Sequence, residues 1–398
     1  MTSEPSTRPL PTGRVPGLLY IRDSVGQVRK HRHNVCGDHH LCHRSFEETY
    51  FILCDGIGSG VRANIAATMC AHRLMHLLTH GISLSRASEM VVSMMHRART
   101  EVGIPFAAFN VAHILNNGQY TVVSYESPAP VLICRGAAES LSQSFLTRGH
   151  EVVAESGGHL RPGEALVLMT DGVTQAGLGR VKGTGWGEER VVAEITATLR
   201  RGIPPDRLPE QILEQARLLS GGSHGDDTTL AVLSCRQAKV LNLLTGPPRI
   251  KGADREFVEG FMAQEGRKVV CGSTTADIVA RVTGQPLKVL ELSTSFASPP
   301  TYQVPGVDLV TEGAVTLNQI YNILEEDLED YQGGSCVGEI CRMMKSADMI
   351  RLFVGGARNL GNQGLEFKQL GVLPRNLIVN LLIEKLRSMG KVVVEEKG

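Results

Sequence analysis

Short apolar segments alternate with longer amphipathic segments from Leu18 onward. The run Tyr50–Cys54 is short and wholly apolar, which predicts a buried strand, and it ends at the glycine-rich turn Asp55–Gly60. Beyond this turn, apolar residues recur at spacings of three and four as far as Leu78, which predicts an amphipathic helix. A second helix is expected to follow, through about Arg99.

The next part of the chain is richer in strand signals. Residues 106–147 contain apolar runs separated by turns, which predicts a meander of antiparallel strands; Asn116–Gly118 is a hairpin-type turn within it. Another strand is expected at Ala165–Thr170, and it runs directly into Asp171-Gly172. Two helices and a last strand complete this part, at 187–200, 206–219 and Thr228–Cys235.

The segment Thr245–Pro248 interrupts the pattern, because Pro-Pro fits neither a helix nor a central strand. After it, strand-like runs alternate with helical patterns, which predicts a smaller α/β domain with a largely parallel sheet. The expected organisation is a polar, disordered tail at 1–17, a first domain at 18–244, a linker at 245–251 and a second domain at 252–398.

Composition narrows the class of protein. Of 398 residues, 42% are hydrophobic and 21% charged, a globular mix that excludes low-complexity and collagen-like chains. Lys+Arg and Asp+Glu balance at 41 each, so nucleic acid is not an expected partner. No apolar stretch approaches the ~20 residues of a membrane span. Nine scattered cysteines without an export signal indicate reduced thiols and a cytoplasmic location.

Aspartates stand at the ends of several predicted strands. Asp55 and Asp171 each end an apolar strand and precede a glycine, Asp226 precedes the last strand of the first domain, and Asp38 lies one strand upstream of Asp55. Any single Asp-Gly pair is typical of a simple turn. Strand ends gather at one edge of a sheet, however, and clustered carboxylates repel one another unless a cation neutralises them. Oxygen-only ligands favour hard ions such as Mg²⁺ or Mn²⁺.

These motifs resemble a known family in their order and strand contexts. The set Gly37-Asp38, Asp55–Gly60, Thr170–Val173 and Gly225–Thr229 is similar to the metal-dependent serine/threonine protein phosphatases (PPM, type 2C), in particular their bacterial sporulation-type (SpoIIE-like) branch. The resemblance covers about residues 18–244. It implies an α+β fold in which a sandwich of two antiparallel sheets is flanked by helices, and bacterial signalling as the context.

The resemblance also implies roles for individual residues. Asp55 would bridge two divalent cations, Mn²⁺ or Mg²⁺; Asp171 and Asp226 would complete the shell of one, and Asp38 with the Gly56 carbonyl would serve the other. A water between the metals would attack phosphoserine or phosphothreonine in a protein substrate. The catalytic set implied is thus Asp38, Asp55, Asp171 and Asp226. In that branch the helices after the bridging aspartate, about 61–79 and 84–101 here, act as a switch.

Two positions depart from many type 2C enzymes. Ile57 stands where they carry a histidine proposed as general acid, and His33, with Arg32 beside it, stands where they carry a phosphate-binding arginine. The sporulation-type branch commonly lacks both. The departures keep open an alternative function, a non-catalytic signalling or interaction protein on a degenerate phosphatase scaffold.

Two further features of the sequence are compatible with a binding site, although each also has an ordinary structural explanation. Histidines and cysteines crowd residues 31–43 around Asp38, but their spacing matches no standard zinc pattern and neighbours on a strand point to opposite faces. In the second domain, Cys271–Ala276 reads as strand, glycine turn and helix start, where exposed amides favour anions, although ordinary capping by Ser273 or Thr274 explains it as well. Expected partners are a phosphoprotein substrate, a protein or small phosphorylated ligand at the second domain, and a second copy of the chain in a homodimer.

Overall fold

The chain forms two compact units, Met1–Gln237 and Ala238–Gly398. The computed structural model describes residues 18–100, 106–148, 151–180, 183–250, 252–291, 300–326, 335–357 and 372–398; the tail expected at 1–17 lies outside them. None of the described helices is both long enough and apolar enough to cross a membrane.

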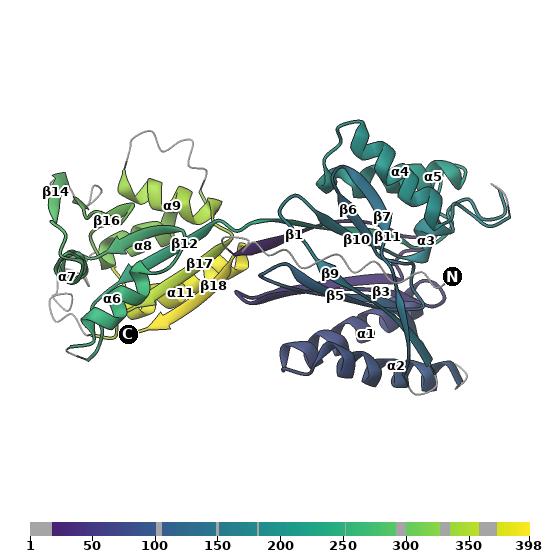
Figure 1. Ribbon diagram of the computed structural model, residues 1–398, viewed down its shortest axis with the longest axis horizontal. Helices are drawn as coiled ribbons and strands as arrows, with labels where there is room; N and C mark the ends of the chain where they lie inside the picture. Colours follow the sequence, from purple (N-terminus) through teal and green to yellow (C-terminus); the bar gives the residue numbers. More distant parts are fainter. Residues whose placement is uncertain are drawn as a thin grey trace, which may run out of the picture. The chain divides into compact units, whose positions relative to one another are not determined.

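Two antiparallel sheets build the first unit (Figure 1). The five-stranded sheet has the order β1-β11-β10-β6-β7 and the six-stranded sheet the order β2-β3-β4-β5-β9-β8. The strands of the first are β1 Leu19–Val28, β11 Thr228–Gln237, β10 Ala165–Met169, β6 Val131–Cys134 and β7 Ala137–Ser140. Those of the second are β2 Asp38–Arg44, β3 Glu48–Gly56, β4 Ala107–Leu115, β5 Gln119–Tyr125, β9 Glu151–His159 and β8 Ser144–Arg148.

Helices cover the outer face of each sheet (Figure 1). α1 Val61–Thr79 and α2 Leu84–Thr100 pack on the six-stranded sheet, and α3 Asp171–Thr174, α4 Glu188–Arg200 and α5 Leu208–Leu219, preceded by the turn η1 Pro205–Arg207, pack on the other. Alternation along the strands places Phe51 and Leu53 against Leu166 and Leu168 in the core between the sheets. The first unit is therefore the α-β-β-α sandwich that the resemblance implies.

A seven-stranded sheet forms the second unit, in the order β14-β15-β16-β13-β12-β17-β18. The five strands from β16 to β18 are parallel, whereas β14 and β15 pair antiparallel at one edge. Their bounds are β12 Val240–Thr245, β13 Arg267–Cys271, β14 Lys288–Glu291, β15 Thr301–Gln303, β16 Leu309–Thr311, β17 Met349–Val354 and β18 Val392–Lys397. The expected α/β domain with a largely parallel sheet is thus observed.

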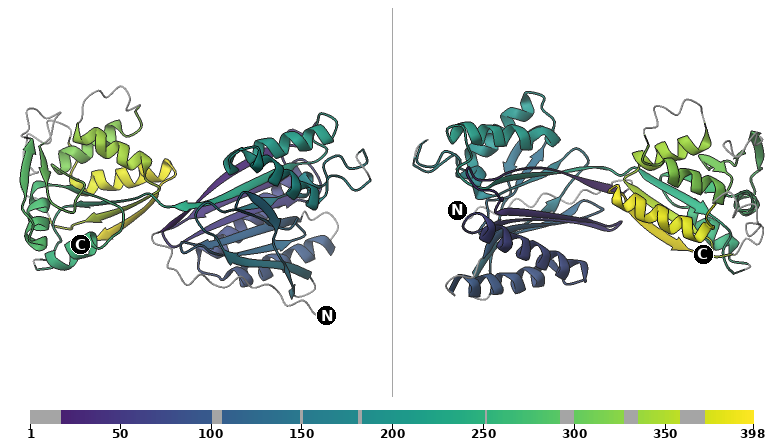
Figure 2. Two further views of the ribbon diagram at one scale, coloured as in Figure 1. Left: turned by 45° about the horizontal axis from the view of Figure 1, so that its top comes forward. Right: turned by 180° about the vertical axis from the view of Figure 1, so that it is seen from behind.

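Helices lie on both faces of this sheet (Figure 2). α6 Asp254–Met262 and α7 Ser273–Thr283 pack with Leu244 and Phe353 on one face. α8 Ala314–Ile323, α9 Cys336–Ser346 and α11 Arg375–Ser388 pack with Leu241 and Leu243 on the other. Parallel strands buried on both sides explain the continuous apolar runs in the sequence.

The boundary between the units differs from the expected linker at 245–251. It lies between Gln237 and Ala238, and β12 is a central strand of the second sheet, hydrogen-bonded to both β13 and β17. Pro247 and Pro248 follow this strand as its loop. The proline pair was a sound signal for the end of a strand, but the division of the chain falls eight residues before Thr245, where β11 passes into β12 with no glycine or proline to mark it.

Candidate active site

The pairing of β2 with β3 brings the first two aspartates together. Asp38 stands directly opposite Asp55 in the antiparallel register, at the first residue of β2 and the second-last of β3. Neighbouring backbone contacts fix this end of the ladder: the Gly56 N–H donates to the Gly37 carbonyl at 3.3 Å. Asp38 is 2% exposed, whereas Asp55 is only partly buried.

The other two aspartates come from the five-stranded sheet. Asp171 follows β10 directly and begins the one-turn helix α3, and Asp226 lies two residues before β11, the neighbour of β10. The charges of Asp38, Asp171 and Asp226 all raise the pKa of Asp55. The four aspartates singled out in the sequence therefore meet where the two sheets end.

Two threonines, one just after β10 and one in β11, hold the Asp38 carboxylate. The hydroxyls of Thr170 and Thr229 both donate to Asp38 Oδ2, at 2.9 and 2.6 Å. The other oxygen, Asp38 Oδ1, is fully buried and has no hydrogen-bond partner. A buried carboxylate oxygen without a partner is costly, so this atom fits a site that expects a cation.

Burial and mutual repulsion disfavour the ionised carboxylates. Burial, followed by the charges of Asp38 and Asp171, raises the pKa of Asp55 to about 10. Burial also raises the pKa of Asp38 to about 7, although the two threonine hydroxyls oppose this rise. The pKa of Asp171 is raised as well, chiefly by burial. Such a set stays fully ionised only if positive charge is supplied nearby.

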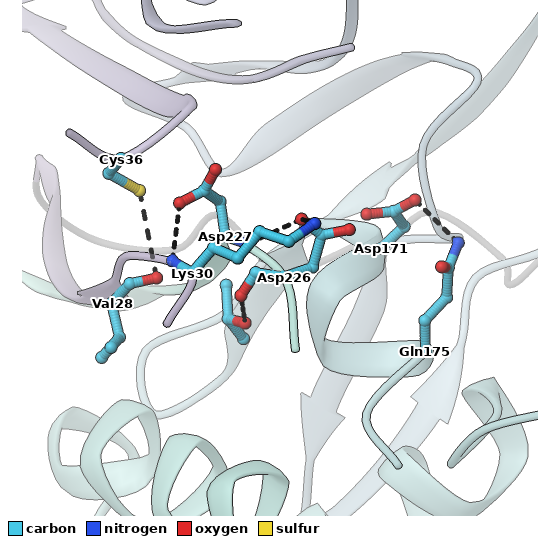
Figure 3. Close-up of polar contacts among 8 residues, drawn as sticks. Val28, Lys30, Cys36, Asp171, Gln175, Asp226 and Asp227 are labelled. Carbon is cyan, nitrogen blue, oxygen red and sulfur yellow. Dashed lines mark hydrogen bonds and ion pairs between the residues drawn. The ribbon is translucent and has the colours of Figure 1, made fainter. Parts of the chain in front are cut away.

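Lys30 supplies one such charge from the connection between β1 and β2. Its side chain runs to Asp226, with Nζ 3.3 Å from Oδ1, and Asp171 lies just beyond (Figure 3). On the far side of Asp171, Gln175 Nε2 donates to Asp171 Oδ2 at 2.7 Å. The ammonium of Lys30 lowers the pKa of Asp171, partly offsetting its burial. Nothing in the local sequence marks Lys30, because it is 196 residues from Asp226.

Asp227 follows Asp226 directly in the sequence, but it contacts the backbone of Lys30 and not its ammonium. It is 4% exposed, and its Oδ1 accepts the Lys30 backbone N–H at 2.8 Å. This contact fixes the backbone that carries the lysine (Figure 3). Sequence reasoning assigned Asp227 no role, and an Asp-Asp pair does not reveal which carboxylate turns inward.

Two glycines allow the close backbone approach that the site needs. A Cβ on Gly56 would lie 1.9 Å from the Ala63 carbonyl oxygen at the start of α1, and one on Gly172 would lie 2.0 Å from the Asp227 carbonyl oxygen. Neither space admits a side chain. The glycine after each strand-end aspartate thus brings α1 and the β11 turn against the carboxylates.

The structure also places Ile57 and His33, the two residues that depart from the family pattern. Ile57 is 43% exposed beside the aspartates and carries no titratable group. His33 is half-buried, with Nδ1 3.3 Å from where a Cβ on Gly60 would lie. The zinc site left open for residues 31–43 gains no support within the described residues: His39 stacks on His72 of α1, and His40 stacks on Phe51.

The donor set suits a hard divalent cation, since it consists of carboxylate oxygens with a backbone carbonyl at Gly56 close by. As the side chains stand, no three His, Cys, Asp or Glu residues within the described ranges are arranged to hold one metal ion. The reason is that the carboxylates are already engaged in contacts with other side chains. Asp171 is engaged by Gln175 and Asp226 by Lys30, and Asp55 shares a hydrogen bond with Asp171.

A sequence comparison identifies the family. The family model described as stage II sporulation protein E (SpoIIE) matches residues 47–236. This chain carries a SpoIIE-like domain of the PPM phosphatases. The match contains Asp55, Asp171 and Asp226, and the fold class and the resemblance stated above are confirmed. Asp38 lies just before the matched range, on the strand paired with β3.

Several solved structures are similar to this chain. The SpoIIE phosphatase domain from Bacillus subtilis has 16% identity over 56% of this chain and 94% of that chain, with a TM-score of 0.43. The RsbU and RsbW domains of Rv1364c from Mycobacterium tuberculosis have 17% identity over 67% and 73%, with a TM-score of 0.47. RsbX in complex with magnesium has 16% identity over 55% and 100%, with a TM-score of 0.39. No curated protein matches the chain.

Proposed function

We propose that the SpoIIE-like domain hydrolyses phosphoserine or phosphothreonine in a protein substrate, with divalent cations, in bacterial signalling. The observation that carries the proposal is the meeting of Asp38, Asp55, Asp171 and Asp226 from two sheets, with one buried Asp38 oxygen left unpartnered. No disulfide joins the cysteines of the described residues, which is compatible with the reducing cytoplasm.

The residues that would hold the cations, Mn²⁺ or Mg²⁺, are the four aspartates and the Gly56 carbonyl. Bound there, two cations would activate a water for in-line attack on phosphorus and neutralise charge on the phosphoryl oxygens. Thr170 and Thr229 keep Asp38 oriented, since both hydroxyls donate to the same oxygen. Cation binding would replace the contacts of Asp171 with Gln175 and of Asp226 with Lys30.

Lys30 is our candidate for holding the substrate phosphate. Its ammonium is beside the carboxylates, and its side chain is 33% exposed, so that a substrate can reach it. Released from Asp226, the ammonium would be free to pair with a phosphoryl oxygen. This assigns to Lys30 the role that His33 leaves open. Ile57 cannot donate a proton, so the leaving alkoxide would be protonated from elsewhere.

A second candidate function rests on the same contacts. Because Lys30 already neutralises Asp226 and no three described side chains are arranged around one ion, the domain would also suit a non-catalytic signalling protein. In that case the lysine would replace a cation permanently. The two functions differ in whether Mn²⁺ binds.

The deciding experiment measures Mn²⁺ binding by calorimetry and Mn²⁺-dependent hydrolysis of p-nitrophenyl phosphate and of a phosphoserine peptide. The wild-type chain is expected to bind Mn²⁺ and to hydrolyse both. Asp171→Asn should lower kcat by about 100-fold or more, since it removes a cation ligand at nearly constant shape. Glu214→Gln, an exposed carboxylate paired with Arg217, serves as the matched control and should retain full activity.

Each result excludes one of the two functions. Mn²⁺ binding with activity that depends on Asp171 excludes the non-catalytic scaffold. A folded wild-type chain that neither binds Mn²⁺ nor hydrolyses either substrate excludes the phosphatase. Equal activity in wild type and Asp171→Asn would also exclude it, because the four carboxylates would then have no part in the reaction.

For Lys30, the informative change is Lys30→Gln, which keeps length and removes charge. If the ammonium holds substrate phosphate, KM should rise about tenfold while Mn²⁺ affinity stays the same or increases, since a competitor for Asp226 is lost. Lys239→Gln, at the start of the second unit, is the charge-matched control. An unchanged KM in Lys30→Gln would remove this residue from the proposed mechanism.

A further inference from the structure

The order in which the parallel strands are added to the sheet of the second unit reverses at one point. From β12 the chain proceeds outward to β13 and β16 on one side, then returns to the other side of β12 for β17 and β18. The switch therefore falls between β12 and β17. In open α/β sheets, ligands bind outside the carboxyl ends of the strands at such a point.

Two helices begin side by side at this edge, and neither is capped. α7 starts after β13 at Gly272 and α8 after β16 at Gly313; neither has a side-chain cap or an acidic residue in its first turn. A Cβ on Gly313 would lie 3.5 Å from Gly272 Cα, so the two N-termini adjoin. Their free N–H groups and partial positive charge attract an anion.

Thr245 gives an independent indication of a ligand here. This last residue of β12 is 1% exposed, yet its Oγ1 has no hydrogen-bond partner. Because side chains alternate along a strand, Thr245 lies on the face of Leu243, which packs in the core cluster with α8 and α11. A buried hydroxyl left without a partner is rare and destabilising, unless a bound group completes it.

A guanidinium lies at the same strand end. Arg375, the first residue of α11, donates through Nη2 to the carbonyls of Gly355 and Ala357, at 2.7 and 2.5 Å. A Cβ on Gly246 would lie 1.9 Å from Arg375 Nη1, so the guanidinium lies against the residue after Thr245. No carboxylate within the described ranges pairs with Arg375, and burial lowers its pKa.

Gly246 contacts both the start of α7 and the Arg375 guanidinium. Its N–H donates to the Thr275 hydroxyl in the first turn of α7, at 3.0 Å, while the Arg375 guanidinium lies against it. The strand end thus has helix amides, an unpartnered hydroxyl and an unpaired cation around one glycine. All of these are hydrogen-bond donors, and phosphate is the group that takes several donors at once.

We propose that the carboxyl edge of this sheet, around Gly246, binds the phosphate group of a small phosphorylated metabolite. The site belongs wholly to the second unit and does not depend on the function proposed for the SpoIIE-like domain. It gives the chain a small-molecule input separate from the four aspartates.

The experiment titrates the full chain with ADP, inorganic pyrophosphate and adenosine by calorimetry, in EDTA so that cation-dependent binding at the aspartates is suppressed. ADP and pyrophosphate are expected to bind, and adenosine, which has no phosphate, is not. Failure of both ADP and pyrophosphate to bind at concentrations up to about 10 mM overturns the proposal.

Matched variants locate the binding. Thr274 is exposed in the first turn of α7. Thr274→Asp should stabilise the helix start and weaken phosphate binding about tenfold or more, whereas Thr274→Asn should bind like wild type. Thr245→Val, which removes only the hydroxyl, should weaken binding about tenfold without lowering Tm.

Asp171→Asn distinguishes the two sites of the chain. Binding of ADP and pyrophosphate should be unchanged in this variant, because Asp171 lies in the first unit. If Asp171→Asn abolishes binding while Thr274→Asp leaves it intact, the phosphate binds at the aspartates and the proposal is overturned. Equal affinities in Thr274→Asp and Thr274→Asn overturn it too.

Discussion

At the scale of single residues, the four aspartates are placed against their own electrostatic preference. Asp38 is buried between the sheets, and only one of its oxygens is satisfied by protein donors. Asp55 has its pKa raised to about 10 by burial and by its acidic neighbours. Folding therefore concentrates negative charge at a point where a chain selected for stability alone would place neutral groups.

The first prediction follows from this repulsion. In EDTA, Asp55→Asn should raise the Tm of the SpoIIE-like domain by about 2–4 °C, because a neutral amide removes the cost of holding this carboxyl protonated far above its ordinary pKa, or ionised beside its acidic neighbours. In Mn²⁺ the order should reverse. The wild type should gain about 2.7 kcal/mol at 100 times its Kd, and the variant should gain little. Differential scanning calorimetry with and without Mn²⁺ measures both.

The control for this prediction is Asp206→Asn, on η1 of the same unit and outside the aspartate site. Its Tm should respond to Mn²⁺ as the wild type does. If Asp55→Asn lowers Tm in EDTA, or keeps the full Mn²⁺ response, then repulsion among the aspartates does not govern the stability of the domain.

The sequence identified some residues of the site and missed others for a physical reason. Asp55 and Asp171 follow apolar strands directly, so a strand pattern locates them. Lys30, Thr170 and Thr229 contact the aspartates across long sequence separations, up to 196 residues, and have no local signature. Which strands become neighbours, and hence which polar side chains meet, is settled by sheet order rather than by local pattern.

At the scale of elements, the turn after β3 controls how closely α1 approaches the carboxylates. Gly56 lies under the first turn of α1, with no room for a side chain next to the Ala63 carbonyl. The helix packs through Ala67, Cys70 and Leu74 onto the same sheet. Its position is therefore fixed by tight contact at one end and by an apolar face along its length.

The second prediction tests this contact. Gly56→Ala should destabilise the SpoIIE-like domain by about 1–3 kcal/mol, because a Cβ 1.9 Å from a backbone oxygen must displace α1. Mn²⁺ affinity should fall with it, since the Gly56 carbonyl belongs to the proposed cation site. Urea unfolding and Mn²⁺ calorimetry measure the two effects.

Gly225→Ala is the comparison for this variant. Gly225 lies beside Asp226, but a Cβ there meets nothing within 4 Å. Its stability and Mn²⁺ affinity should match those of the wild type within about 0.5 kcal/mol. Equal effects of the two substitutions would show that space at Gly56 is not what places α1.

Elements with strong periodicity were predictable, and the division between the units was not. α1 and α2 occupy the ranges expected for the switch helices, although a switching role stays a prediction. The sequence pattern predicts no strand at Val240–Thr245, so β12 falls inside the range 18–244 expected for the first domain, whose end is marked only by Pro247-Pro248. An apolar strand looks the same in the sequence whichever of two sheets it joins.

At the scale of the whole molecule, the chain contains separate hydrophobic cores. Three buried hydrophobic clusters, one between the two sheets of the first unit and one on the outer face of each, contain only first-unit residues. The two clusters on the faces of the second unit's sheet contain only second-unit residues. Units with their own cores unfold as separate cooperative transitions when few contacts join them.

The third prediction is that calorimetry of the full chain resolves two transitions. Phe261→Ala, at a fully buried position of α6, should lower only the transition of the second unit, by the equivalent of about 3–5 kcal/mol. The Mn²⁺ response of the other transition should be unaffected. Leu377→Ala, at an exposed position of α11, should change neither. A single transition shifted as a whole by Phe261→Ala would contradict two independent units.

The hydrogen bond from Thr229 to Asp38 spans 191 residues and joins β2, in the six-stranded sheet, to β11, the last strand of the first unit along the chain. During translation, Asp38 therefore lacks the Thr229 hydroxyl until β11 has left the ribosome exit tunnel. A prematurely terminated polypeptide lacking β11 would hold Asp38 and Asp55 paired on β2 and β3, but without the Thr229 hydroxyl and without the partner strand of β1. Incomplete synthesis products would thus lack the completed set of strand-end contacts around Asp38, whatever helices and hairpins they had already formed.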